Sequence, residues 1–321
     1  MAIDVVLDVD TGVDDALALL FATAHPALRV RAVTCVAGNV DVDQATRNSL
    51  AVLDAAGHPD IPVARGADRP LLRPFNGARA VHGDNGLGGI DVPDAKRSAD
   101  SVHAVELLRR TIMDSPGEVT LIALAPLTNV ALLLRMYPET AAALGNVMVM
   151  GGSVGAGNTT AAAEFNIWQD PEAAAIVLSS GVPLTMYGLD VFYQVTVDAA
   201  GVKRLLESSK PGASLAARLL EGRTGTWRHE SRITEPEAAC VGDAGAVCAV
   251  ADPQGLTTRS LPVHVALGEG PTRGLTLVDV RGNPNSVPLS GDVGVGQVDV
   301  GVAVDGARYR RLFVETVAAD D

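Results

Sequence analysis

Cysteine, aromatic residues, basic charge and long apolar runs are all scarce in this chain. Only 3 of its 321 residues are cysteine, and none forms a Cys-x-x-Cys pair. This argues against a disulfide framework and a thiolate zinc site, so we expect buried, reduced thiols at Cys35, Cys240 and Cys248. No apolar run approaches the roughly 18 residues that span a bilayer, and the N-terminus lacks the features of a signal peptide. We therefore expect a cytoplasmic protein without a membrane partner.

Charge and hydropathy narrow the class of ligand. Acidic residues outnumber basic ones by 38 to 25, which gives a formal net charge of −13. A nucleic-acid polymer is bound mainly by Lys and Arg on its phosphates, so this excess argues against such a partner. With 47% hydrophobic residues the chain can bury a large core. We therefore expect a globular protein that acts on a small molecule.

Short β-branched segments alternate with Ala- and Leu-rich segments of helical periodicity. This alternation is typical of an α/β fold with a mostly parallel central sheet and helices on both faces. The predicted strands cover residues 3–10, 29–37, 119–124, 146–150 and 183–187. The predicted helices between them cover residues 14–24, 43–56, 102–113, 127–137 and 171–180.

The rest of the chain continues this pattern. We predict later helices at 203–221 and 238–251, a strand-rich region at 261–304 and a short last helix. The stretch 66–99 is rich in Gly, Pro, Asn and Asp and long for a loop, and loops of that kind are often functional. No linker, repeat or low-complexity tract interrupts the chain, so we predict one domain over 1–321.

The segment VVLDVDTGVDDALALL at residues 5–20 places four carboxylates where a strand turns into a helix. Asp10 should stand at the carboxyl end of the first strand, and Asp14 and Asp15 should begin the helix. Open α/β sheets bind their ligands at that edge. Two interpretations stay open: the acids can cap the turn and complement the helix dipole, or they can bind a divalent cation that relieves their repulsion.

Two families share parts of this segment. LDVDTG resembles the motif of haloacid-dehalogenase-type phosphatases, in which an Asp attacks a phosphoryl group. Gly12 and the following VDDALALL do not fit that motif. The whole run is more similar to the DTDxGxDDAxA signature of the inosine-uridine-preferring nucleoside hydrolase family, with Val9 where many members have Thr.

Segments throughout the chain resemble the same family. CVAGNV at 35–40 and VHGDNGLGG at 81–89 contain Asn39 and His82. ALAPLTNVA at 123–131 contains Leu124. MGGSVGAGNTTAAAEFNIWQDPEAA at 150–174 is similar to the family's sugar-binding segment, and EAACVGDAGAVCAVADP at 237–253 supplies Asp243.

The resemblance implies a Rossmann-like nucleoside hydrolase fold and calcium-dependent hydrolysis of ribonucleosides to free base and ribose. It also implies a role in purine and pyrimidine salvage and a homodimer or homotetramer. Asp10 would be the general base, and the metal ligands would be Asp10, Asp15, Asp243 and the backbone carbonyl of Leu124. These donors are all hard oxygens, which suit Ca²⁺. The residues implied to bind the ribose hydroxyls are Asp14, Asn39, Met150, Asn158, Glu164 and Asn166.

The sequence departs from the family at the group that assists the leaving base. Gly242 stands where the inosine-uridine-preferring members have a His. His82 is then the candidate catalytic residue beside the base, and Trp227 and His229 in RTGTWRHESR are candidates to fold over it. The missing His also leaves open a non-catalytic homologue that binds calcium and ribose, as an alternative to the hydrolase.

Overall fold

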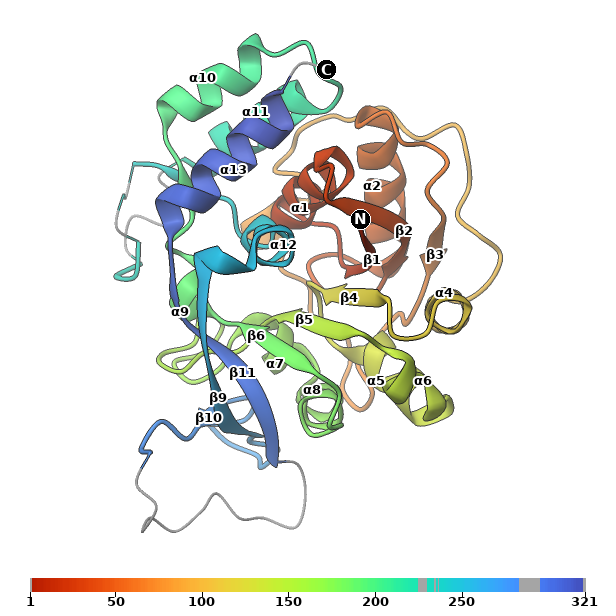
Figure 1. The fold of residues 1–321 in the computed structure, drawn as a ribbon, viewed down its shortest axis with the longest axis vertical. Helices are drawn as coiled ribbons and strands as arrows, with labels where there is room; N and C mark the ends of the chain where they lie inside the picture. The colour runs from red at the N-terminus through yellow and green to blue at the C-terminus, as the bar shows by residue number, and fades with distance from the viewer. Residues whose placement is uncertain (1, 225–229, 234, 236, 283–294, 320–321) are drawn as a thin grey trace.

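The computed structural model describes residues 2–224, 230–233, 235, 237–282 and 295–319. Its centre is a nine-stranded sheet in the order β10-β9-β11-β6-β5-β4-β1-β2-β3 (Figure 1). The strands from β3 to β11 in this order run parallel, and β9 and β10 are antiparallel to their neighbours. This confirms the predicted α/β class with a mostly parallel sheet.

The sheet strands are β1 (Ile3–Val9), β2 (Leu28–Cys35), β3 (Val63–Arg65), β4 (Val119–Ala123), β5 (Asn146–Met150), β6 (Leu184–Tyr187), β9 (Leu256–Val265), β10 (Thr276–Val278) and β11 (Val295–Val304). The helices are α1 (Val13–Ala24), α2 (Val42–Ala55), α3 (Arg79–His82), α4 (Ala104–Asp114), α5 (Thr128–Met136), α6 (Glu139–Ala143), α7 (Phe165–Gln169), α8 (Pro171–Leu178), α9 (Leu189–Phe192), α10 (Ala199–Glu207), α11 (Ala213–Arg223), α12 (Ala244–Ala251) and α13 (Gly306–Ala318). A small second sheet pairs β7 (Thr196–Val197) with β8 (Ala239–Cys240).

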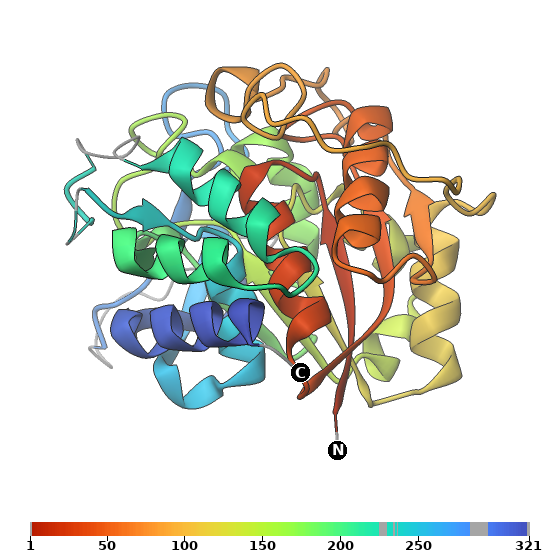
Figure 2. The same ribbon diagram turned by 90° about the horizontal axis from the view of Figure 1, so that it is seen from above.

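Helices cover both faces of the sheet. On one face lie α1, α2 and the group α10 to α13, which Figure 2 shows from above, and on the other lie α4, α5, α6 and α8 (Figures 1 and 2). Successive side chains of β1 face opposite sides of the sheet. Val5 and Leu7 pack with the first group of helices, and Val6 packs with the second. Burial on both faces explains why the middle of β1, residues 5–7, is continuously apolar.

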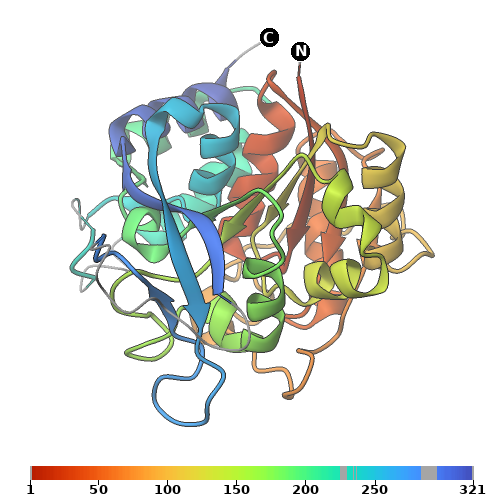
Figure 3. The ribbon, with the colours of Figure 1, turned by 60° about the horizontal axis from the view of Figure 1, so that its bottom comes forward.

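The chain reverses its direction across the sheet at β1. From β1 it passes to β2 and β3 on one side, and later to β4, β5 and β6 on the other. The long strands β9 and β11 extend the sheet on this far side (Figure 3), and the short strand β10 forms its edge. Loops leaving β1 and β4 at their carboxyl ends therefore diverge, and open sheets bind ligands at such a point.

The single helix predicted at 203–221 is wrong. The structure has two helices there, α10 and α11, which are separated at Pro211 and Gly212. Proline lacks the N–H that a helix needs and disfavours a helical residue before it. Gly212 has φ of 84°, in the left-handed region. The apolar periodicity on both sides concealed this break.

The helix predicted at 238–251 begins later than expected. Residues Ala239–Cys240 form strand β8, Gly242 has φ of 60°, and α12 starts only at Ala244. The left-handed glycine turns the chain so that Asp243 precedes the helix. The three cysteines are buried and unpaired, as expected. Among the described residues, no helix combines the length and apolarity needed to cross a membrane.

A buried carboxylate joins the beginnings of β1 and β2. Asp4, which is 4% exposed, accepts hydrogen bonds from Nε and Nη2 of Arg29 and from Nη1 of Arg31, the last at 2.6 Å. The hydrogen bond from Arg29, followed by that from Arg31, outweighs burial and lowers the pKa of Asp4 below its usual 3.8. The stabilisation is therefore present above the unfolded-state pKa and is lost as the pH falls through the lowered pKa.

We expect Asp4→Asn to lower the free energy of unfolding by about 1–2 kcal/mol at pH 7, because two arginines lose a charged acceptor. Urea unfolding followed by circular dichroism measures the change, and the difference from wild type should shrink at pH 3. Asp43→Asn is the matched control, because Asp43 pairs with Arg65 where both side chains are exposed. A change there as large as at Asp4 would contradict this explanation.

Candidate active site

The turn between β1 and α1 fixes the first carboxylates. Asp15 lies in the first turn of α1, and its side chain accepts the backbone N–H groups of Asp10, at 3.2 Å, and Gly12, at 2.9 Å. These bonds bend the chain sharply after β1 and hold the Asp15 carboxylate at the helix N-terminus. The helix start favours negative charge there, so the capping interpretation holds for Asp15.

Asp10 lies fully buried next to Asp15, at the end of β1. Its Oδ2 accepts the backbone N–H of Asn39 at 2.6 Å, and its Oδ1 accepts Nδ2 of the same residue at 3.0 Å. Asn39 also donates to Oδ2 of Asp15 at 3.1 Å. A Cβ atom on Gly38 would lie 1.9 Å from Oδ2 of Asp10, so only glycine fits there. Asn39 thus binds the two carboxylates together.

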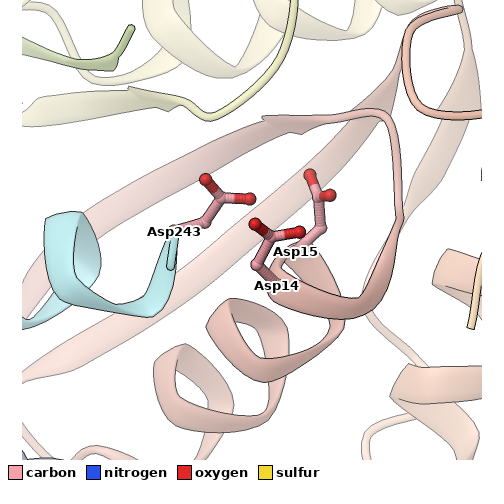
Figure 4. A group of neighbouring side chains, drawn as sticks. All are labelled: Asp14, Asp15 and Asp243. Carbon is pink, nitrogen blue, oxygen red and sulfur yellow. The ribbon is translucent and has the colours of Figure 1, made fainter. Parts of the chain in front are cut away.

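Three carboxylates converge from two distant parts of the chain. Asp14 and Asp15 extend from the start of α1, and Asp243 extends from the residue before α12 (Figure 4). One oxygen from each lies within 4.8 Å of the others, and all three residues are buried. This is an all-oxygen group of the size that a divalent cation bridges.

The mutual repulsion of these acids appears in their pKa values. Burial and then the charge of Asp14 raise the pKa of Asp15 to about 7. Burial raises the pKa of Asp10 and Asp243 well above the usual value, and the neighbouring carboxylates raise them further. Asp14 differs, because Arg223 and then His82 outweigh its burial and lower its pKa. Bound positive charge would allow Asp10, Asp15 and Asp243 to ionise together.

The converging group and the metal ligands that the resemblance implied share two residues. Asp15 and Asp243 belong to the converging group, but Asp14 is its third member. Both side-chain oxygens of Asp10 are engaged by Asn39. The carbonyl of Leu124 accepts Nδ2 of Asn166 at 3.0 Å.

A cavity opens beside these acids at the carboxyl edge of the sheet. It brings together most of the side chains predicted to bind substrate. Its lining consists of Asp14, Asn39, Ala78, Val81, His82, Leu124, Met150, Asn158, Thr159, Glu164, Phe165, Asn166, Phe192, Tyr193, Arg223 and Asp243. Trp227 and His229, the other predicted base-contacting residues, lie outside the described residues.

Glu164 and Asn166 tie the far wall of the cavity to the sheet. Glu164 caps α7, accepting the backbone N–H groups of Asn166 and Ile167, and it also accepts that of Gly152 at 3.0 Å. Asn166 donates Nδ2 to the carbonyls of Leu124 and Met150, at 3.0 and 3.1 Å. Burial raises the pKa of Glu164 to about 7 despite these N–H groups. The polar groups on this wall are therefore held rigidly.

Asn158 stands next to this wall. Its Oδ1 accepts the backbone N–H of Phe165 at 2.9 Å, which links the Gly-rich loop to the start of α7. Asn158, Glu164 and Asn166 thus place amide and carboxylate groups along this side of the cavity.

His82, which belongs to the long loop 66–99, lines the opposite side of the cavity. The backbone N–H of Val13 donates to its Nδ1 at 3.2 Å, so the hydrogen of the neutral ring is on Nε2. The same Nδ1 lies 3.6 Å from Oδ1 of Asp14. Burial lowers the pKa of His82 to about 4, although Asp14 opposes this shift. His82 is therefore a neutral hydrogen-bond donor near pH 7.

Arg223 is the charged residue of the cavity lining that the sequence analysis did not identify. It ends α11, is 6% exposed, and places Nη1 3.4 Å from Oδ1 of Asp14. Its one local signal is its spacing: it lies four residues after Leu219 and three after Leu220, which places it on the apolar face of the helix. Only the packing of α11 against α1 brings it to Asp14.

Gly242 has no room for a side chain. Its φ is 60°, and a Cβ atom there would lie 2.5 Å from Cβ and 2.7 Å from Oδ2 of Asp14. The local backbone therefore excludes a side chain at this position, including the His that the resemblance implied.

Comparisons with known proteins agree with this geometry. The family model described as inosine-uridine preferring nucleoside hydrolase matches residues 5–311. The chain is 39% identical over 299 residues to the pyrimidine-specific ribonucleoside hydrolase RihA of Salmonella choleraesuis (strain SC-B67), covering 91% of this chain and 94% of the relative.

Solved structures show the same fold over the whole chain. The plant nucleoside hydrolase PpNRh1 superposes with a TM-score of 0.90 at 32% identity, covering 100% of both chains. The purine-preferring ribonucleoside hydrolase from Gardnerella vaginalis gives a TM-score of 0.87 at 31% identity, covering 98% of both. The chain therefore belongs to the inosine-uridine preferring nucleoside hydrolase family and is a nucleoside hydrolase that acts on ribonucleosides.

Proposed function

We propose that the protein hydrolyses the N-glycosidic bond of ribonucleosides with the help of bound calcium, and that Asp10 is the general base. The observation that carries this proposal is the buried group of Asp14, Asp15 and Asp243, of which Asp14 and Asp243 line the cavity and Asp15 is hydrogen-bonded to Asp10. Membership of the family removes the reason for the phosphatase alternative, which depended on the LDVDTG segment alone.

The donor set fits a hard divalent cation. Asp14, Asp15 and Asp243 present carboxylate oxygens, and Leu124 lines the same cavity. Arg223 lies against Asp14, yet the pKa of Asp15 is still raised to about 7, so this one guanidinium does not balance the group. Oxygen-only sites with several carboxylates suit Ca²⁺ better than zinc or copper. When bound there, calcium would supply positive charge that makes a neighbouring water more acidic and orients the sugar.

The chain's own residues would then perform the proton transfer. Asp10 is held by Asn39 in one orientation and can accept a proton from the attacking water as the water oxygen bonds to C1′ of the ribose. The surrounding carboxylates stabilise the positive charge that develops on the sugar. Asn39, Asn158, Glu164 and Asn166, with Asp14 and Met150, line the space that the ribose would occupy.

The non-catalytic alternative rests on one specific observation. Gly242 provides no acid and no space for one. A protein that bound calcium and ribose without turnover would need the same carboxylates and amides. Turnover therefore has to be measured together with binding.

We expect the protein to release reducing sugar from at least one member of a panel of purine and pyrimidine ribonucleosides in the presence of calcium. Chelation with EDTA should abolish the release, and added calcium should restore it. Undiminished release after complete chelation would contradict the metal dependence. Calcium and ribose binding without any release would favour the non-catalytic alternative.

We expect Asp10→Asn to reduce kcat by about a thousandfold, because an amide cannot accept the proton of the attacking water. Calcium binding, measured by titration calorimetry, should be largely preserved, since Asp14, Asp15 and Asp243 remain. Asp114→Asn, an exposed acid at the end of α4, is the control and should leave kcat unchanged. Wild-type kcat in the Asp10 variant would remove Asp10 as the base.

We expect Gly242→His to lower both stability and activity and not to restore the family's leaving-group acid, because the new side chain would displace Asp14. Gly242→Ala already introduces the clash and should cost at least about 2 kcal/mol more than Gly181→Ala. Gly181 also has positive φ, of 79°, but no atom lies within 4 Å of a Cβ there. Thermal unfolding compares the two. Equal losses would show that the backbone angle alone, and not Asp14, excludes a side chain.

A further inference from the structure

Glycosidic cleavage by the proposed function, on which this inference rests, leaves negative charge on the base. The water oxygen bonds to C1′, the proton of the water passes to Asp10, and the electron pair of the C1′–N bond departs with the base. The base is then an anion until it takes a proton from solvent. A group that stabilises this developing negative charge in the transition state accelerates the reaction.

Position 242, where the resemblance implied a His that donates a proton to the leaving base, is a glycine. Gly242 packs against Asp14 and leaves no space for an acid. His82 uses Nδ1 to accept the backbone N–H of Val13. It can offer the base one hydrogen bond through Nε2, but it carries no fixed charge.

Arg223 supplies such a charge at the same place. Among the described residues that line the cavity, it is the sole arginine or lysine. Its Nη1 and Nδ1 of His82 approach the same oxygen, Oδ1 of Asp14, at 3.4 and 3.6 Å. The guanidinium therefore lies on the His82 side of the cavity.

The surroundings of Arg223 strengthen the electrostatic effect of its charge on neighbouring groups. Arg223 and Val81 also line a second, small cavity, whose other walls include Val13, Leu87, Ile90 and Leu219. Apolar walls keep the local dielectric constant low, so a fixed cation acts more strongly there than in water. Asp14 holds one side of the guanidinium and thereby sets its orientation.

We propose that Arg223 is a catalytic residue that stabilises the departing base as an anion, in place of an acid that would protonate it. The proposal goes beyond a structural ion pair, because it assigns the guanidinium to the reacting base and not only to Asp14. A guanidinium keeps its proton at every working pH, so its contribution is charge and hydrogen bonds. It favours substrates whose base carries an acceptor oxygen beside the glycosidic nitrogen, as pyrimidine O2 does.

Leaving-group dependence separates these two roles of Arg223. The test measures kcat/KM for wild type, Arg223→Met, Arg223→Lys and Arg218→Met. Arg218 is an exposed arginine on the same helix and serves as the control. The substrates are uridine, or the ribonucleoside that wild type cleaves fastest, and 4-nitrophenyl riboside, whose phenolate leaves without assistance.

We expect Arg223→Met to lower kcat/KM for the nucleoside at least about 100-fold and for the nitrophenyl riboside by less than about tenfold. Arg223→Lys, which keeps a charge but loses the fork, should fall between wild type and Arg223→Met on the nucleoside. Arg218→Met should match wild type on both substrates. If Arg223→Met does not fold, a selective loss on the nucleoside in Arg223→Lys supports the proposal in its place.

Equal losses on the two substrates, in whichever variant folds, would overturn the proposal and leave Arg223 as a partner of Asp14 only. That result would leave the proposed hydrolysis intact, because wild type would still cleave both compounds. Failure of wild type to release sugar from any riboside would instead overturn the proposed function, and this inference with it.

Discussion

Repulsion among buried carboxylates is the constraint on which the site depends. Asp10, Asp14, Asp15 and Asp243 lie at one edge of the sheet with almost no exposure to water. Such charges are stable together only if fixed dipoles and cations surround them. The fold provides the dipoles through the backbone N–H groups of Asp10 and Gly12 and the amide of Asn39. The remaining negative charge would favour binding of a cation, as the proposed function requires.

The guanidinium of Arg223 and the group of carboxylates lie in different parts of the cavity, which therefore has two regions of different charge. One is the oxygen-rich region at Asp243, next to Asp15, which the proposed function assigns to a divalent cation and the ribose. The other is the region of Arg223 and His82. Asp14 borders both, because it joins the converging acids and also faces the guanidinium. Hydrolysis of a nucleoside needs this division, because positive charge develops on the sugar while negative charge develops on the base.

The features that could be predicted from the sequence are those that depend on the spacing of residues within one contiguous segment. The acids from Asp8 to Asp15 had to gather at the end of one strand, because the strand, turn and helix are contiguous. The segments around Leu124 and Glu164 follow strands of the same parallel sheet, so their convergence could also be expected. The break at Pro211 and Gly212 was missed because the periodicity on both sides continued. The meeting of Arg223 with Asp14 could not be predicted, since it depends on how α11 packs on α1.

An enzyme that uses a fixed cation in place of an acid requires a different property of the leaving base. A proton donor removes the charge of the leaving base, whereas a guanidinium only lowers its energy, so the base must be able to delocalise the charge itself. Gly242 and Arg223 are linked in this respect through Asp14, which fills the space above the glycine and orients the arginine. A side chain at 242 would displace Asp14 and with it the guanidinium. Gly242 and Arg223 thus belong to one arrangement, in which the absence of a proton donor at 242 is coupled to the placement of a permanent charge.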